Sequence, residues 1–352
     1  MLLVTTWFGS FLLEDGKAVR SRPFPKEPDA IAQRLALVEE WKVLEEERDL
    51  MSGLDEVFVT EPRLERAGGN LVREPPPFLN PEDFGYDRSL LHEAMLALAR
   101  RRMRKAVGPD DYLAQAVAAY DDLAEISNQL LERLREWYGL HFPELAKIVD
   151  GEAFAELVAE HGDRGSMPIG SMESVGGPLG PEDREALMGA AALARDVSRQ
   201  RRRLEAHIDA RIRELAPNVR ALAGPLVGAR LIALAGGIEP LARLPASTVQ
   251  LLGAERALFR HLREGTRPPK HGVLFQHPLI HRAPRWQRGA LARALAGKLC
   301  MAARADAYTK RYIADSLKVV LDESVAEARK THATPPPPRP RGAARRRAPR
   351  RR

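Results

Sequence analysis

The sequence is poor in cysteine and aromatic residues, and it lacks long apolar runs. Cys300 is its only cysteine, which excludes an internal disulfide and a cysteine-based metal cluster. Aromatic residues make up 6% of the 352 residues, whereas alanine, leucine, arginine and glutamate are abundant, a composition that favours helices. No stretch reaches the roughly 18 uninterrupted apolar residues of a membrane span. The N-terminal segment has no basic start and no long apolar stretch, so we expect no signal peptide and no membrane partner.

The motifs of common enzyme classes are also missing. The sequence has no glycine-rich dinucleotide-binding motif, no phosphate-binding loop, no nucleophile elbow and no zinc-protease helix motif. His271, His277 and His281 lie close together, but no cysteine or nearby carboxylate completes a metal site. Hydrogen bonding to a partner or plain packing is the favoured role for these histidines. We therefore expect no catalytic residue, no metal and no cofactor in this chain.

Charge is distributed unevenly along the chain. Residues 1–216 contain 28 Lys and Arg against 40 Asp and Glu, whereas residues 217–320 contain 17 against 5. Residues 321–352 contain 10 against 3, and the net charge of +7 for the whole chain conceals this division. An acidic first part followed by a basic block predicts two kinds of partner, with the basic block meeting a polyanion.

Two stretches carry apolar residues at alternating steps of three and four, which is typical of coiled coils. The first runs from Leu113 to Tyr138 and includes the polar Ser127. We expect an antiparallel hairpin with a short helix and a Gly, Ser and Met loop between its arms; two helices of an ordinary bundle are the alternative. The second stretch is expected to place these residues on the seam: Leu187, Ala190, Ala194, Val197, Arg201, Leu204, Ile208, Arg211 and Leu215.

The predicted fold is mainly α, with a small α/β N-terminal domain, a long antiparallel coiled coil and an all-helical C-terminal domain. β-prone runs near the N-terminus and the break at Pro75-Pro76-Pro77 indicate the first domain. The last segment is rich in proline and holds eight arginines, so we expect it to be disordered and to bind phosphate without reading sequence, or only to aid solubility. The expected segments are residues 1–85, 86–215, 216–330 and 331–352.

Several long motifs resemble one known family. PPKHGVLFQHPLIHRAPRWQRGALARALAGKLCMAARADAY, which begins at Pro268, and the preceding GAERALFRHLREG resemble the Nop domain. WYGLHFPEL at 137–145 and APNVRALAGPLVGARLIALAGG at 216–237 resemble the segments where the family's first arm ends and its second arm enters that domain. The resemblance covers about residues 85–320 and is strongest to archaeal Nop-domain scaffolds of box C/D ribonucleoproteins, with eukaryotic nucleolar and spliceosomal relatives further away.

The resemblance implies a scaffold that is not an enzyme. In this family the Nop domain binds kink-turn guide RNA together with a small ribosomal-protein-like partner, and the coiled coil forms a homodimer. The N-terminal domain, residues 1–85 here, holds fibrillarin, which uses S-adenosylmethionine to methylate the ribose 2′-hydroxyl of a guide-selected rRNA or tRNA. The chain itself is then expected to carry no cofactor and to be cytoplasmic in an archaeal cell or nucleolar in a eukaryotic one.

The resemblance also implies two groups of RNA-binding residues before residue 265. Gly253, Ala254, Glu255 and Arg256 match the family's GAEK-type motif, with arginine in place of the usual lysine. The ALFR motif, associated with the ends of the guide–substrate duplex, is matched by Ala257, Leu258, Phe259 and Arg260. An aromatic ring beside an arginine can stack on a terminal base pair and hold phosphate, whereas a core role for Phe259 is the alternative.

Further RNA-binding candidates follow in the central motif and the next helix. Gln276 and His277 are expected to hydrogen-bond the kink-turn RNA, and Lys270, next to His271, is expected to bind phosphate. Arg304 is expected to form an internal ion pair with Asp306 instead. Ala290 replaces the lysine of the family's RGK-type pattern. The candidates on helical or near-helical spacing are Arg288, Arg293 and Lys298.

Two other functions fit parts of the pattern. The first half of the basic block has short helices joined by glycine turns and is similar to helix-hairpin-helix modules, so a DNA-binding protein of repair or replication is the alternative. Tight helix packing also explains these glycines. An RNA-modifying enzyme is a third hypothesis, which the missing cofactor motifs disfavour. The acidic first part favours the scaffold, because a lone nucleic-acid binder gains little from it.

Overall fold

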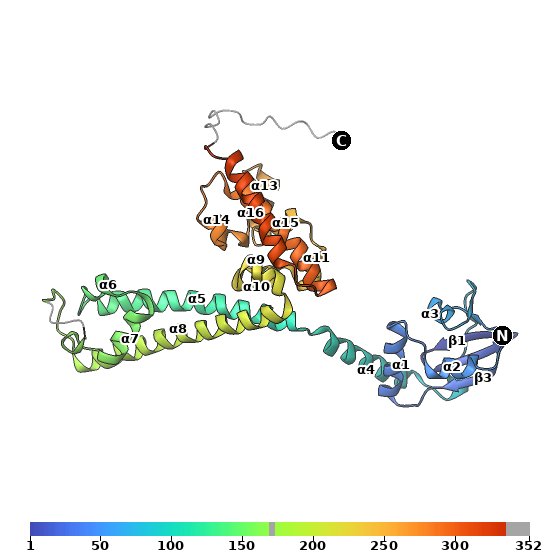
Figure 1. The fold of residues 1–352 in the computed structure, drawn as a ribbon. Helices are drawn as coiled ribbons and strands as arrows, with labels where there is room; N and C mark the ends of the chain where they lie inside the picture. Colours follow the sequence, from blue (N-terminus) through green and yellow to red (C-terminus); the bar gives the residue numbers. More distant parts are fainter. Residues whose placement is uncertain (169–172, 336–352) are drawn as a thin grey trace. The chain divides into compact units, whose positions relative to one another are not determined.

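The computed structural model describes residues 1–168 and 173–335, so the arginine-rich tail expected to be disordered lies outside the described residues. The chain divides into two units, Met1–Gly108 and Pro109–Arg352, each described by itself below (Figure 1). Within the described ranges, none of the helices combines the length and hydropathy that crossing a bilayer requires.

The first unit is built on a mixed five-stranded sheet of order β3-β2-β1-β4-β5. β1 and β2 form an antiparallel hairpin, whereas β4 pairs with β1 and β5 with β4 in parallel. The sheet confirms the predicted small α/β domain. Its strands are β1 (Leu2–Thr6), β2 (Gly9–Glu14), β3 (Lys17–Pro23), β4 (Phe58–Val59) and β5 (Asn70–Leu71).

The first unit extends past residue 85, where the sequence suggested a boundary, because α4 packs against α1. Ala94 of α4 is buried in the same apolar cluster as Phe24 and Ile31. The helices of this unit are α1 (Pro28–Glu39), α2 (Glu45–Met51), α3 (Pro62–Glu65), the 3-10 turn η1 (Pro81–Phe84) and α4 (Arg88–Ala106).

A buried ion pair fastens α3 to α2 in the first unit. Arg63 and Glu47 are both buried, and Arg63 Nη1 donates to Glu47 Oε2 at 2.7 Å. The same guanidinium donates to the carbonyl of Lys42 at 2.8 Å, and Glu47 accepts the backbone N–H of Leu44 at 2.8 Å. The charges therefore have partners inside the protein, which makes removal of either one costly.

The second unit begins with a helical hairpin formed by α5 (Pro109–Tyr138) and α8 (Pro181–Leu215). Leu113 at the start of α5 shares one buried cluster with Ile212 near the end of α8, whereas Tyr138 shares another with Leu187. This pairing confirms the predicted antiparallel hairpin. Between these clusters the hydroxyls of Ser127 and Ser198 lie 3.0 Å apart, both buried.

The predicted seam of α8 is correct only in part. Leu187, Ala194 and Ile208 are buried as predicted. Ala191, Ser198 and Ile212 replace the predicted Ala190, Val197 and Arg211. The shift has a simple physical cause at its C-terminal end, where Arg211 stays at the surface and pairs with Glu214 at 3.0 Å while isoleucine takes the buried position.

The end of the hairpin is closed by short elements: α6 (Leu145–Ile148), α7 (Gly151–His161) and the 3-10 turn η2 (Arg164–Ser166). α7 packs on α8. Residues 173–177 pair with the segment after α5, where Gly177 N–H donates to the Leu140 carbonyl at 2.8 Å. The backbones come so close that a Cβ on Gly176 would lie 2.0 Å from the His141 carbonyl oxygen.

The remaining described residues form a helical module on α10, α11 and α15, which share one apolar core with Leu113 of α5 and Ile212 of α8. No strand occurs in this described part, which confirms the all-helical prediction. Its elements are α9 (Pro217–Ala223), α10 (Pro225–Ala235), α11 (Ile238–Arg243), α12 (Ala246–Leu251), α13 (Glu255–Glu264), η3 (Val273–Gln276), α14 (Pro278–His281), α15 (Arg288–Arg304), the π-helical turn η4 (Ala305–Thr309) and α16 (Ala314–Thr331).

The expected ion pair between Arg304 and Asp306 is wrong. Arg304 Nε donates instead to the carbonyl of Ala242 at 3.2 Å. Asp306 is buried and accepts the side-chain amide of Asn218 at 2.6 Å and the backbone N–H of Val219 at 2.9 Å. Burial raises the pKa of Asp306, and these hydrogen bonds oppose the rise. Asp306 therefore acts as a buried cap for the start of α9.

Candidate nucleic-acid interface

A tight backbone junction brings two separate sequence motifs together. The N–H of Gly272 donates to the Gln250 carbonyl at 2.9 Å, and the N–H of Val273 donates to the Leu252 carbonyl at 2.7 Å. A Cβ on Gly272 would lie 1.8 Å from the Leu252 carbonyl oxygen, so only glycine fits. The loop between α12 and α13 is therefore held against the start of η3.

The predicted loop Gly253 to Arg256 lies at this junction. Gly253 has φ +82°, a conformation that glycine adopts without strain, and its N–H donates to Glu255 Oε1 at 2.6 Å. Ala254 precedes the first residue of α13, and Arg256 is exposed. The Glu255 carboxylate is thus used to shape the loop, while the Arg256 side chain projects into solvent.

α13 presents its apolar residues to solvent. None of its residues is buried, Leu258 is half-buried, and Phe259 is 63% exposed beside an exposed Arg260. The core role considered for Phe259 is therefore wrong. An exposed phenylalanine next to an arginine can stack on a base and contact phosphate, as the ALFR motif predicts.

His271 and Arg288 both contact the ring of Phe275. The rings of His271 and Phe275 stack with centroids 4.7 Å apart, and the guanidinium carbon of Arg288 lies 5.0 Å from the Phe275 centroid. Arg288 also donates to the carbonyls of Ala283 at 2.9 Å and His281 at 3.2 Å. Burial, assisted by Arg288, lowers the pKa of His271. Arg288, expected to bind RNA, is therefore held by partners within the module.

His277 caps a helix. Its Nδ1 accepts the backbone N–H of Leu279 at 3.2 Å, at the start of α14, and Pro278 occupies the first helical position. Burial lowers the pKa of His277, while a hydrogen bond with the backbone of Leu222 acts against the shift. The ring is therefore neutral near pH 7, and its Nδ1 is occupied within the protein.

The three clustered histidines form no metal site. Across residues 1–168 and 173–335, no group of three or more His, Cys, Asp or Glu side chains is arranged to hold a metal ion. His281 instead lies 5.1 Å from the ring centroid of Phe275, so its role is packing.

Lys270 lies beside the start of α15. Its Nζ donates to the carbonyl of Arg285 at 3.0 Å, and its own carbonyl accepts Gln250 Nε2 at 2.7 Å. A Cβ on Gly289 would be only 3.7 Å from the Lys270 side chain, an ordinary contact. Lys270 is exposed, so its ammonium can still reach a phosphate.

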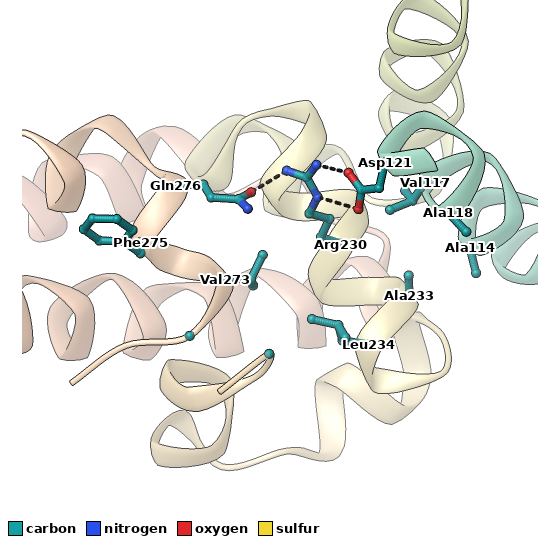
Figure 2. Close-up of a pocket in the computed structure, with 12 residues that line it drawn as sticks. Ala114, Val117, Ala118, Asp121, Arg230, Ala233, Leu234, Val273, Phe275 and Gln276 are labelled. Carbon is teal, nitrogen blue, oxygen red and sulfur yellow. Dashed lines mark hydrogen bonds and ion pairs between the residues drawn. The ribbon is translucent and has the colours of Figure 1, made fainter. Parts of the chain in front are cut away.

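Gln276, which was expected with His277 to hydrogen-bond RNA, borders a cavity of about 580 Å³ (Figure 2). α5 supplies one wall through Ala114, Val117 and Ala118. Arg230 of α10 donates to Gln276 Oε1 and forms an ion pair with Asp121 of α5. Sequence reasoning missed Arg230, although it lies within the matched stretch 216–237.

Several cations of the module form no ion pair with the described acidic residues. In the described part of the chain, no ion pair engages Arg293 or Lys298 of α15, whereas Arg199 and Arg202 of α8 pair with Glu156 and Glu152. Cations without counter-charges attract a polyanion. Among the described residues, four further arginines likewise form no ion pair: Arg256, Arg260, Arg267 and Arg282.

The fold and this surface define a class of protein: a mainly helical chain in which a basic module, with exposed aromatic and arginine side chains, is joined to a helical hairpin. The family model described as "Nop: snoRNA binding domain, fibrillarin" matches residues 119–328. The chain belongs to the Nop family.

Similar proteins occur in archaea and fungi. An uncharacterized NOP5 family protein of Methanocaldococcus jannaschii is 41% identical over 277 residues, which cover 73% of this chain and 66% of the relative. Nucleolar protein 58 of Aspergillus terreus is 38% identical over 256 residues, which cover 67% of this chain and 44% of the relative. The chain thus spans slightly less than two thirds of the first relative and less than half of the second.

One solved structure resembles this chain distantly. A chain of the fibrillarin/Nop5p complex is 23% identical and has a TM-score of 0.42, with 93% of this chain and all of that chain covered. A TM-score of this size does not establish a common overall arrangement.

Proposed function

We propose that this chain is the non-catalytic scaffold of a box C/D guide-RNA ribonucleoprotein that methylates ribose 2′-hydroxyls of rRNA or tRNA. The observation that carries the proposal is the set of basic side chains on Gly253–Arg256, α13 and α15, which lie within the residues matched by the Nop family model. Arg256, Arg260, Arg293 and Lys298 form no ion pair with the described acidic residues, so they remain available for RNA phosphates.

The RNA contacts divide by chemistry. Arg256, Arg260, Arg293 and Lys298 supply phosphate contacts, which position the RNA without reading sequence. Phe259 stacks on the end of the guide–substrate duplex. A separate group, Lys270 and the loop 253–255, contacts both the kink-turn RNA and its ribosomal-protein-like partner. Neither the RNA alone nor the protein alone makes all of these contacts.

The hairpin joins two copies of the chain. Its closed end exposes Leu140 at 73% and Val175 at 90%, and Ile148 is exposed nearby in sequence. A second copy that covers these side chains would remove apolar area from water and stabilise a homodimer.

The first unit holds the methyltransferase. In this assignment it binds fibrillarin, which uses S-adenosylmethionine, and the present chain supplies no reacting group. The proposal therefore predicts that methylation requires both proteins although only fibrillarin binds the methyl donor.

RNA binding is tested with the full chain, a labelled kink-turn RNA, and the same RNA already bound by a kink-turn protein. We expect weak binding to free RNA and at least tenfold tighter binding to the RNA–protein complex. Arg293→Ala and Lys298→Ala should each remove one phosphate contact, which reduces the slope of log affinity against log salt concentration by about 1. Arg243→Ala is the control, because Arg243 already pairs with Glu239. Equal affinity for random duplex DNA would refute the proposal.

A further inference from the structure

Arg230 connects three elements of the second unit. Its side chain is 17% exposed, and its guanidinium lies 5.8 Å from the ring centroid of Tyr120 on α5. Nε donates to Asp121 Oδ2 at 3.3 Å and Nη2 donates to Asp121 Oδ1, while Nη1 donates to Gln276 Oε1 (Figure 2). One side chain of α10 thus bonds both α5 and η3.

The chemistry of arginine fixes the orientation of the Gln276 amide. Arginine has five N–H donors and no acceptor, so only the carbonyl oxygen of glutamine can face it. The Nε2 amino group must then point away from Arg230. Among the described residues it has no hydrogen-bond partner, and Gln276 is exposed. The outward group of Gln276 is therefore a donor of two hydrogen bonds.

Asp121 makes this arrangement possible. An arginine with little exposure needs a counter-charge, and the Asp121 carboxylate supplies it through both oxygens. Because Asp121 holds the Nε and Nη2 side of the fork, Nη1 is directed towards Gln276. A lysine at position 230 has a single ammonium and cannot hold both groups in this planar geometry.

We infer that Arg230 is a positioning residue that makes Gln276 a hydrogen-bond donor towards RNA. This inference rests on the proposed RNA-binding function. Gln276 then presents its amino group to RNA and selects acceptor atoms: phosphate oxygens, ribose oxygens or base carbonyl and ring-nitrogen atoms. Fixing the amide beforehand also removes the entropy cost of ordering it when RNA binds.

A double-mutant cycle on the full chain tests the inference. Affinities for a kink-turn RNA prebound by its kink-turn protein are measured for wild type, Arg230→Met, Gln276→Ala and the double variant. We expect each single variant to bind about five to ten times more weakly, the loss of one hydrogen bond. In the Gln276→Ala background, Arg230→Met should have no further effect. Equal weakening by Arg230→Met in both backgrounds would show a merely structural role and overturn the inference.

Conservative variants test the direction of the hydrogen bond. Gln276→Glu keeps an oxygen for Arg230 but has no N–H group, so it should bind as weakly as Gln276→Ala. Arg230→Lys should not restore wild-type affinity. Wild-type affinity of Gln276→Glu would overturn the inference while leaving the proposed function intact, whereas failure of the wild-type chain to bind the RNA–protein complex would overturn both.

Discussion

Replacing Gly272 by alanine tests the backbone junction that positions the candidate interface. The added Cβ would lie 1.8 Å from the Leu252 carbonyl oxygen and 2.6 Å from its carbonyl carbon. Both contacts are with backbone, so no flexible side chain can move away. The two segments must separate, which breaks the hydrogen bonds from Gly272 to Gln250 and from Val273 to Leu252.

The expected loss of stability follows from these contacts. Each backbone hydrogen bond contributes about 1 kcal/mol net, and forcing an extra carbon into a packed site costs about 1–3 kcal/mol. Gly272→Ala should therefore lower the free energy of unfolding of the second unit by about 3–5 kcal/mol. Affinity for the kink-turn complex should fall as well, because Gly253 and Arg256 lose their support.

Gly289→Ala is the matched control. It adds the same methyl group in the same module, where the new Cβ would make only an ordinary 3.7 Å contact with Lys270. Because alanine is favoured over glycine in helices, stability should be unchanged or higher by up to about 1 kcal/mol. Urea unfolding followed by circular dichroism measures both variants. Equal stabilities of Gly272→Ala and Gly289→Ala would refute the reasoning.

Three further predictions concern other parts of the chain. Arg63→Met should destabilise the first unit by about 3–5 kcal/mol, because it leaves the buried Glu47 carboxylate without its counter-charge. Arg102→Met removes an exposed ion pair with Glu39 and should destabilise it by at most about 1 kcal/mol. Similar unfolding temperatures of the two variants in calorimetry would contradict this. Ser198→Ala should lower the free energy of unfolding by about 1–3 kcal/mol, because the buried Ser127 hydroxyl loses its partner. Ser127→Ala should lower it less, since Ser198 also donates to a helix carbonyl at 2.9 Å. Equal losses of stability in urea unfolding would count against this. Because the pKa of His277 is lowered in the folded protein, protonation of this ring favours the unfolded state, and its contribution to stability is present above about pH 6.5 and is lost as the pH falls. His277→Asn keeps a capping acceptor but does not titrate, so the free energy of unfolding should depend less on pH. An unchanged pH profile would refute this prediction.

The long-range plan of the hairpin could be predicted because a three-four repeat persists along both helices. Leu113 and Tyr138 mark the ends of an arm whose buried residues follow the repeat closely. The second arm was less readable, because adjacent alanines at 190 and 191 fit the seam equally well. Only packing against the partner helix selects between them.

The site was predictable at the level of motifs but not of individual roles. Gly253 and the ring of Phe259 are exposed, as a contact with RNA would require. His277 and Arg288 instead have partners within the module. The histidine before Pro278 carried a helix-start signal that could have indicated its capping role.

The contacts that sequence could not provide join residues far apart in the chain. Asp306 binds Asn218, 88 residues away, and Arg230 binds Asp121, 109 residues away. Neither pair has a local pattern, because tertiary packing alone brings the partners together.

In the proposed function, this chain organises methylation without performing it. A reconstitution with guide RNA, substrate RNA, kink-turn protein, fibrillarin and S-adenosylmethionine tests it, with and without the chain. We predict guide-directed 2′-O-methylation only when the chain is present, and no methyl transfer when fibrillarin alone is omitted. Full methylation without the chain, or methyl transfer by the chain without fibrillarin, would contradict the proposed function.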